Sequence, residues 1–173
     1  SACGCCWAFA AASAASDRLC IATNASIVEP LSAQDVCFCA SSNGCGGGDI
    51  STPWRHMKFG GLFFSGPGVV SGGQYQGTGP FGPGFCSDFS LPHCHHHGPQ
   101  GDDPYPAEGT KGCPNVNTSP SCPKKCDSTA KAPHNDFEAD KLGFKGDLLS
   151  VSGADKIAQA IMEGGPVETA FTV

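Results

Sequence analysis

Residues 1–20 read SACGCCWAFAAASAASDRLC, and three of the first six residues are cysteines. Alanine dominates residues 6–19 and neither glycine nor proline interrupts them, so this stretch predicts a helix that begins at Cys6. A cysteine at a helix start lies beside unpaired N–H groups and the positive end of the helix dipole, which favour the thiolate over the thiol. Cys6 is therefore the candidate nucleophile, and Cys3 is the candidate for a bridge that anchors the loop leading into the helix.

Composition narrows the class of protein. The chain has 173 residues, of which 24 are glycine and 14 are proline, and this favours a loop-rich fold over a regular helical bundle. Its formal net charge of −6 repels phosphate backbones, so nucleic acid is not an expected partner. No stretch has the apolar length of a membrane span, so we expect no membrane partner either.

Twelve cysteines are the strongest compositional signal. In an oxidising compartment they form a disulfide framework, which predicts a protein of the secretory route. The sequons at Asn24 and Asn117 agree with this. A protein of this kind should carry a signal peptide, none is present, and the chain stops within a predicted strand. We therefore expect an internal fragment of a longer protein.

The order of predicted elements indicates an α+β fold with helices first. Ser32 is an N-cap signal for a second helix, and residues 51–59 predict a third with Pro53 in its first turn. Residues 60–133 contain frequent glycine, proline and cysteine residues and predict a long, loop-rich segment. We expect disulfides to hold this segment in place.

The last part of the chain predicts strands around one helix. Residues 144–152 and 166–173 have strand character. Between them, residues 153–165 predict an amphipathic helix that stops at Gly164. Its expected core face comprises Ile157, Ala160 and Ile161.

The segment CGCCWAF at residues 3–9 resembles the C-G-S-C-W-A-F signature of papain-like cysteine peptidases. In that family the cysteine before tryptophan is the nucleophile and the first cysteine is disulfide-bonded. The resemblance therefore implies that Cys6 is catalytic and that Cys3 is structural. Cys5 takes the place of the family's usual serine.

Further segments narrow the resemblance to the cathepsin B-like subfamily, and they occur in the subfamily's order along nearly the whole chain. They are SDRLC, LSAQD, CGGGD, VVSGGQY, PHCHHH and GGPVETAFTV. PHCHHH resembles the occluding loop that distinguishes this subfamily.

The resemblance implies a papain-like fold of two subdomains. Residues 1–90 would form the helical left subdomain, residues 91–115 the occluding-loop insertion, and residues 116–173 the first part of the β-rich right subdomain. The implied activity is thiol-dependent peptide-bond hydrolysis, both as an endopeptidase and as a peptidyl-dipeptidase, in a lysosomal or secreted enzyme. Implied partners are peptide and protein substrates, the enzyme's own pro-segment and cystatin-like inhibitors, with no cofactor and no metal.

The resemblance also implies roles for residues other than Cys6. The glycines of the CGGGD loop would bind an extended peptide through their backbone, and two apolar residues would line the pocket for the side chain two before the scissile bond. Two histidines of the occluding loop would hold a substrate's C-terminal carboxylate, which suits imidazoles that charge near acidic pH. The implied substrate-binding residues are Trp7, Gly47, Gly48, Ile50, Ala170, His96 and His97.

A disulfide map follows from the same resemblance. The implied pairs are Cys3–Cys45, Cys39–Cys122, Cys86–Cys126 and Cys94–Cys113. Cys20 would pair with a cysteine upstream of Ser1, and Cys37 has no obvious counterpart. Cys5 has three possible states. We rank a reduced, packed thiol first, and the others are a bond to Cys37 and a vicinal disulfide with Cys6 that would mask the nucleophile.

The chain departs from the family pattern at several catalytic positions. The catalytic histidine and its asparagine would lie downstream of residue 173, and the glutamine of the oxyanion hole upstream of Ser1. None of the histidines present (His56, His93, His95, His96, His97 and His134) matches the catalytic one. We therefore expect this chain alone to be inactive and its longer parent to be active.

The sequence also permits two other functions. Cys5 and Gly46 replace a serine and an asparagine of the family pattern, which gives weight to a non-catalytic, secreted binding protein of the cathepsin B-like kind. The HCHHH run could belong to a metal-binding module instead, although consecutive histidines rarely close one tetrahedral site.

Overall fold

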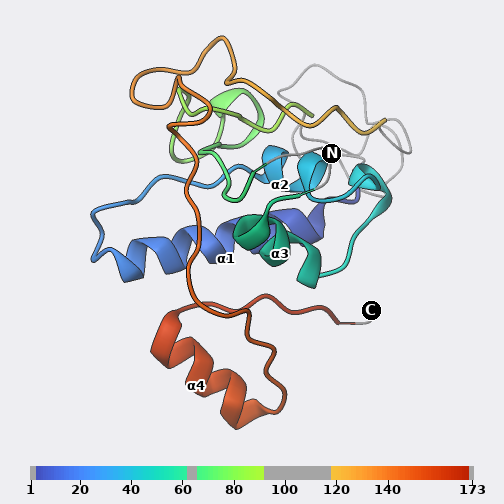
Figure 1. Ribbon diagram of the computed structural model, residues 1–173, viewed down its shortest axis with the longest axis vertical. Coiled ribbons are helices and arrows are strands. Elements are labelled where there is room, and N and C mark those ends of the chain that lie inside the picture. The colour runs from blue at the N-terminus through green and yellow to red at the C-terminus, as the bar shows by residue number, and fades with distance from the viewer. Residues whose placement is uncertain (1–2, 62–65, 92–117, 172–173) are drawn as a thin grey trace.

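The computed structural model describes residues 3–61, 66–91 and 118–171 (Figure 1). Its helices are α1 (Cys6–Ala22), α2 (Ala33–Cys39), α3 (Ser51–Phe59) and α4 (Ala154–Gly164), with short 3₁₀ helices η1 (Gly44–Gly46) and η3 (Tyr75–Gly77). The four α-helices confirm the helices predicted at these places, and α1 runs three residues beyond the predicted end at Leu19.

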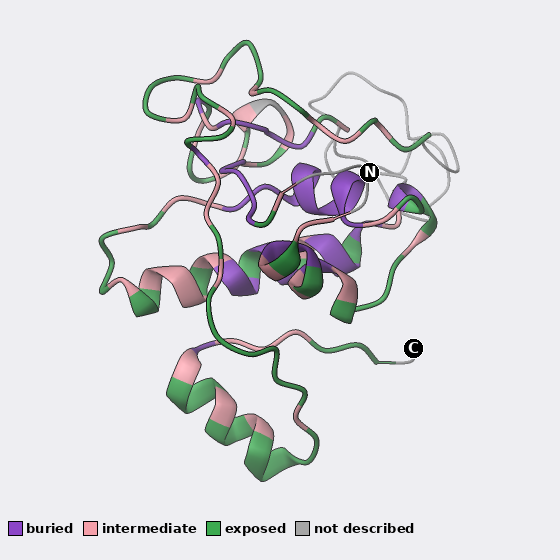
Figure 2. Cartoon of the chain, in the orientation of Figure 1, coloured by how far each residue is buried: buried purple, intermediate pink, exposed green. Residues whose placement is uncertain are grey.

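Helix α1 lies at the centre of the core, and its buried face consists almost wholly of alanine. Its buried residues are Trp7, Ala8, Ala11, Ala12, Ala14 and Ala15. Side chains this small let α2 and α3 pack closely against α1. Figure 2 shows the buried residues gathered in α1 and α2 and in the chain beside them.

Helix α2 is buried along its whole length, and its first turn is held by two side chains. Ser32 Oγ accepts a hydrogen bond from the Asp35 backbone N–H at 3.0 Å and donates to the Ser87 carbonyl at 2.7 Å. Asp35 Oδ2 accepts from the Val70 N–H at 3.1 Å. The N-cap predicted from the sequence therefore also joins α2 to two later segments of the chain.

We expect Ser32→Ala to lower the free energy of unfolding by about 2–3 kcal/mol. The change removes an N-cap, worth about 1 kcal/mol, and leaves the buried Ser87 carbonyl without its donor, which costs a further 1–2 kcal/mol or so. The measurement is urea unfolding followed by circular dichroism. Ser13→Ala is the matched control, because Ser13 is exposed on α1 and its loss should change stability by less than about 0.5 kcal/mol. Equal effects of the two changes would contradict this assignment.

Disulfides hold the loop-rich middle of the chain, as predicted. Cys39, the last residue of α2, is bonded to Cys122, and Cys86 is bonded to Cys126. The sequence separations are 83 and 40 residues, so each bond closes a long loop of the chain.

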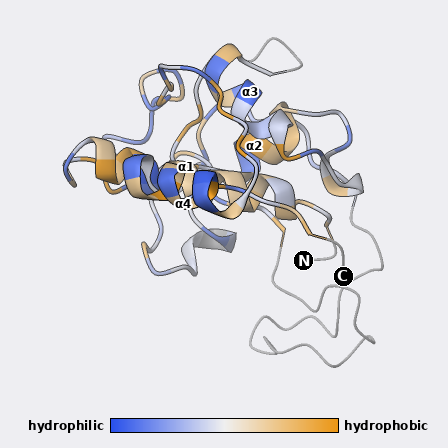
Figure 3. Cartoon of the chain, turned by 90° about the horizontal axis from the view of Figure 1, so that it is seen from below, coloured by the Kyte–Doolittle hydropathy of each residue, from blue (hydrophilic) through white to orange (hydrophobic). Residues whose placement is uncertain are grey.

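Helix α4 corrects the prediction that Ile157, Ala160 and Ile161 face the core. None of its residues is buried, and Ile161 is 44% exposed. Figure 1 shows α4 set apart from the other helices, and Figure 3 shows hydrophobic and hydrophilic residues along it. Its attachment to α1 runs through Arg18, whose Nε donates to the Pro166 carbonyl at 2.7 Å. An amphipathic pattern predicts an apolar face, but the fold decides what covers that face.

The predicted strands over residues 144–152 and 166–173 are not present in the described part of the chain. Its only β-pairing is two isolated antiparallel bridges, Leu31 with Ser71 and Val69 with Leu142. A strand needs a neighbouring strand to pair its backbone groups, and residues 144–152 and 166–171 have none among the described residues. The described part of residues 116–173 therefore contains one helix and no strand, in place of the expected β-rich subdomain.

None of the helices in the described ranges combines the length and apolar character needed to cross a membrane.

Candidate active site

Cys6 is the first residue of α1, and its side chain is exposed and carries a free thiol. Cys5 is the N-cap residue, and its carbonyl accepts hydrogen bonds from the Ala8 and Phe9 N–H groups at 2.9 and 3.0 Å. Trp7 and Ala8 face the core. The buried face of α1 thus sets the helix so that Cys6 points outward at the start of the helix.

The glycine loop, residues 44–48, packs on the residue after the thiol. A Cβ atom at Gly48 would lie 2.4 Å from the nearest atom of the buried Trp7 ring, so no larger residue fits there without moving the indole. Gly47 has a φ of +100°, which favours glycine, and its carbonyl accepts from Asn43 Nδ2 at 2.8 Å. The fold therefore brings Gly47 and Gly48 to the start of α1.

The chain before α1 is fastened to the same loop by two interactions. The Gly4 N–H donates to the Cys45 carbonyl at 2.8 Å, and Cys3 is disulfide-bonded to Cys45. A Cβ atom at Gly4 would lie 2.8 Å from that carbonyl oxygen, so the close approach requires glycine. Residues on both sides of Cys6 are thus held against the glycine loop.

Among the described residues, the disulfides agree with three of the implied pairs and correct one hypothesis. Cys3–Cys45, Cys39–Cys122 and Cys86–Cys126 are present. Cys5 is bonded to Cys37, so the reduced thiol that we ranked first and the vicinal bond to Cys6 are both absent. The pattern-based ranking was wrong because only packing places α2, and with it Cys37, beside the start of α1. Cys20 is free, and the implied pair Cys94–Cys113 lies outside the described residues.

Sequence reasoning assigned no role to Glu168, yet this residue joins the last segment of the chain to α3. Trp54 Nε1 donates to Glu168 Oε2 at 2.6 Å. Burial raises the pKa of Glu168 from its usual 4.5 to about 7, the Trp54 hydrogen bond opposes that rise, and the charge of Asp49 adds to it. The signal in the sequence was the carboxylate within an otherwise apolar GGPVETAF segment.

We expect the tryptophan fluorescence to titrate with a midpoint near pH 7, and Glu168→Gln to remove that transition. Glutamine keeps an oxygen for Trp54 but cannot ionise. Because the folded state holds the Glu168 proton more tightly, its contribution to stability is full below pH 4.5 and is lost as the pH rises through about 7. Glu163→Gln, on the exposed surface of α4, is the matched control and should leave the midpoint in place. A transition that survives in Glu168→Gln would show that another group causes it.

The predicted pocket residues Ile50 and Ala170 are exposed and lie on the two segments that the Trp54–Glu168 contact joins. Ile50 is the N-cap residue of α3, and Ala170 follows Glu168 by two positions. The predicted occluding-loop histidines, His96 and His97, lie outside the described residues.

Neither histidine in the described ranges makes a hydrogen bond with Cys6. His56 is buried, its ring nitrogens have no hydrogen-bond partner, and its Nε2 lies 3.8 Å from Asp35 Oδ1. His134 lies beside Asp140, with Nδ1 2.6 Å from Oδ1. Cys6 therefore has no general base among these residues, which agrees with the mismatch between these histidines and the family pattern.

Ser71, His134 and Asp140 meet, but their geometry is not that of a hydrolytic triad. In such a triad the serine and the carboxylate occupy opposite nitrogens of the imidazole. Here His134 Nδ1 faces both, at 3.2 Å from Ser71 Oγ and 2.6 Å from Asp140. The buried Ser71 hydroxyl donates to Asp140 Oδ2 and accepts from the Cys86 N–H. The group ties residues 71, 86 and 134–140 together and offers no free nucleophile.

One group of possible metal ligands occurs within the described ranges, and it comprises Cys3, Cys5 and Cys45. All three sulfurs are held in disulfides, which do not supply the thiolate that a metal needs.

Comparison with known proteins agrees with this site. Residues 1–173 match the family described as "Papain family cysteine protease". The chain is 34% identical to Cathepsin B-like cysteine proteinase 6 and 37% identical to Cathepsin B-like cysteine proteinase 4, both of Caenorhabditis elegans. It is 34% identical to a cathepsin B-like cysteine proteinase of Schistosoma japonicum. These alignments cover 99–100% of this chain but only 41–46% of the relatives, so the chain spans less than half of their length.

Proposed function

Because this chain belongs to the papain family of cysteine proteases, we propose that it carries the nucleophile of a cathepsin B-like peptidase. The activity proposed for the whole protein is hydrolysis of peptide bonds, both within chains and by release of C-terminal dipeptides. The observation that carries this proposal is the exposed free thiol of Cys6 at the start of α1, beside the glycine loop. Four disulfides in the described residues support the secretory route, and we propose a lysosomal or secreted location.

In the proposed reaction the Cys6 thiolate attacks the carbonyl carbon of the scissile peptide bond. The carbonyl oxygen becomes an oxyanion, which the Cys6 backbone N–H at the helix start stabilises. The C–N bond then breaks, the amine leaves with a proton from a histidine acid, and Cys6 holds the acyl group as a thioester. Water attacks the thioester and releases the carboxylic acid and the thiol. The described residues supply the nucleophile and the helix-start N–H, and the histidine must come from elsewhere in the protein.

Substrate binding is proposed for the surface around this thiol. Gly47 and Gly48 would pair with an extended peptide through backbone groups, and the closeness of Gly48 to Trp7 supports a peptide path along this loop. Ile50 and Ala170 would line the pocket for the side chain two before the scissile bond. His96 and His97 would bind the substrate's terminal carboxylate. The division into residues 1–90, 91–115 and 116–173 stays part of this proposal, as do a pro-segment and cystatin-like inhibitors as partners.

The test is hydrolysis of two peptide substrates by the protein produced from the complete coding sequence. An internally quenched peptide reports endopeptidase activity. A peptide with a free C-terminus reports dipeptide release by mass spectrometry, and the same peptide with an amidated C-terminus is its control. We expect both activities at acidic pH, with loss of dipeptide release from the amide, and no turnover by the 173 residues alone. Turnover by these residues would contradict the assigned need for a histidine from elsewhere.

A non-catalytic binding protein of the same family is the second candidate. The observation that favours it is that Cys5, in place of serine, is crosslinked to Cys37 directly before the thiol. This candidate predicts that the complete protein binds peptides, measured by isothermal titration calorimetry, without cleaving them between pH 4 and pH 8 or so. Cleavage in that range rules it out.

A further inference from the structure

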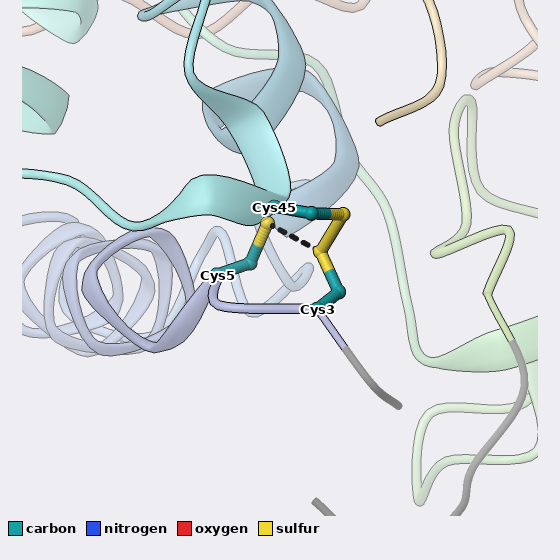
Figure 4. A group of neighbouring side chains, drawn as sticks. All are labelled: Cys3, Cys5 and Cys45. Carbon is teal, nitrogen blue, oxygen red and sulfur yellow. Dashed lines mark hydrogen bonds between the residues drawn. A yellow bond between two sulfur atoms is a disulfide. The ribbon is translucent and has the colours of Figure 1, made fainter. Parts of the chain in front are cut away.

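Two disulfides meet directly before the candidate nucleophile. Cys3–Cys45 joins the chain entry to η1, and Cys5–Cys37 joins the N-cap residue of α1 to α2. The sulfurs of Cys3 and Cys5 lie 3.2 Å apart, and the sulfurs of Cys3, Cys5 and Cys45 all lie within 4.8 Å of one another. All four cysteines are buried. Figure 4 shows the Cys5 sulfur directed toward Cys3 of the neighbouring disulfide.

We propose that Cys3, Cys5, Cys37 and Cys45 form one exchange-coupled unit, in which Cys5, once released from Cys37, attacks Cys3 and frees Cys45. The first step needs a dithiol reductant. It gives two electrons and two protons to the Cys5–Cys37 bond and is itself oxidised to a disulfide. In the second step the Cys5 thiolate bonds to the Cys3 sulfur, the Cys3–Cys45 bond breaks, and its electron pair leaves with Cys45, which takes up a proton. The second step changes no net oxidation state.

Placement makes Cys5 the attacking group. Exchange requires a thiolate in contact with a disulfide sulfur, and Cys5 already has that contact with Cys3. Its position at the N-cap of α1 lies beside the unpaired N–H groups that favour a thiolate. Holding both reactants in one packed core replaces a collision between molecules with a step inside one molecule. Cys37 is bonded to the attacking sulfur itself and is not among the three clustered sulfurs.

The exchange would loosen the glycine loop without consuming the Cys6 thiol. Cys45 lies in η1, directly before Gly46, Gly47 and Gly48, and its bond to Cys3 is the covalent link between that loop and the start of α1. After exchange, the hydrogen bond from Gly4 to the Cys45 carbonyl remains, but the crosslink is gone. A reductant that keeps Cys6 reduced would therefore also loosen the glycine loop beside it. This inference holds whether or not the protein cleaves peptides.

The test compares Cys37→Ala with Cys5→Ser in the 173-residue chain, on a background in which both free cysteines of the described structure, Cys6 and Cys20, are serine. Cys37→Ala leaves a thiol at Cys5, in contact with Cys3, and no reductant is then needed. Cys5→Ser instead leaves the unpaired thiol at Cys37. Each protein is quenched with acid, unfolded and alkylated, and the labelled positions are found by tandem mass spectrometry. We expect Cys45 labelling in Cys37→Ala to exceed that in Cys5→Ser by about 10-fold or more, together with a Cys3–Cys5 crosslink.

Labelling of Cys5 alone in Cys37→Ala, with Cys45 unlabelled, would overturn the proposal. The Cys39–Cys122 and Cys86–Cys126 bonds are internal references, because their retention shows that the variant kept its native pairing. If a variant loses them, the deciding measurement is limited reduction of the unmodified chain by a dithiol. A Cys3–Cys5 crosslink with Cys37 and Cys45 both labelled supports exchange, and loss of Cys5–Cys37 with Cys3–Cys45 retained refutes it.

Discussion

Cys6→Ala is expected to lower the rate of peptide hydrolysis by the complete protein by at least about 10⁴-fold, to the background of the assay. The reason is that Cys6 is the exposed free thiol at the start of a helix, where the chain also supplies an N–H group for the oxyanion. Without the sulfur no thioester forms, so the remaining groups can bind a peptide but cannot cleave it. The measurement is the initial rate with a quenched fluorogenic peptide.

Ser13→Ala is the matched control for this prediction. Ser13 lies on the same helix as Cys6 and is exposed. Its removal should leave the rate within about twofold of the unmodified protein, since surface changes away from a site rarely matter. Both variants should retain the same circular dichroism spectrum. Residual hydrolysis in Cys6→Ala above one hundredth or so of the original rate would mean that another group is the nucleophile.

Removing the Cys39–Cys122 bond by a double change to alanine is expected to lower the free energy of unfolding by about 4 kcal/mol. The bond closes a loop with a sequence separation of 83 residues, and opening it restores conformational entropy mainly to the unfolded chain. The native state loses little else, because Cys39 stays in a fully buried helix whose packing alanine can keep. Denaturant unfolding under non-reducing conditions measures the change.

The pair Cys86 and Cys126 is the comparison, because it closes a shorter loop of 40 residues. The same loop-entropy argument gives a loss smaller by about 0.7 kcal/mol for this pair. Cys20→Ala in the 173-residue chain serves as a control that removes a sulfur without opening a bond, because Cys20 is free there. A loss of less than about 1 kcal/mol for the Cys39–Cys122 variant would show that the unfolded chain is already constrained.

The helices could be predicted because their signals are local. Alanine without glycine or proline from Cys6 onward, the N-cap at Ser32 and the stop at Gly164 each act within one or two turns of the chain. The strands at residues 144–152 and 166–173 were predicted from local strand character, which for residues 166–173 was an alternation of side chains. Alternation of apolar and polar side chains marks a segment that could form a strand. Forming one requires a neighbouring strand to pair with its backbone, and the described residues provide none for these segments.

The same distinction explains the candidate site. The place of Cys6 at a helix start follows from the order of residues along the chain, and the structure has it there. The partner of Cys5 does not follow, because α2 must first pack on α1 before Cys37 comes near. Glu168 is a further case, since its neighbours Trp54 and Asp49 are more than a hundred residues earlier in the chain.

The sequence by itself determined that a helix of this chain begins at Cys6 and that the middle of the chain depends on disulfides, because helix signals and cysteine content are properties of the chain. Only the tertiary structure decided that Cys5 is crosslinked beside Cys3 and that Glu168 keeps its proton to about pH 7. A thiol's partner and a carboxyl's pKa depend on which atoms surround them, and that surrounding exists only once distant segments have packed together.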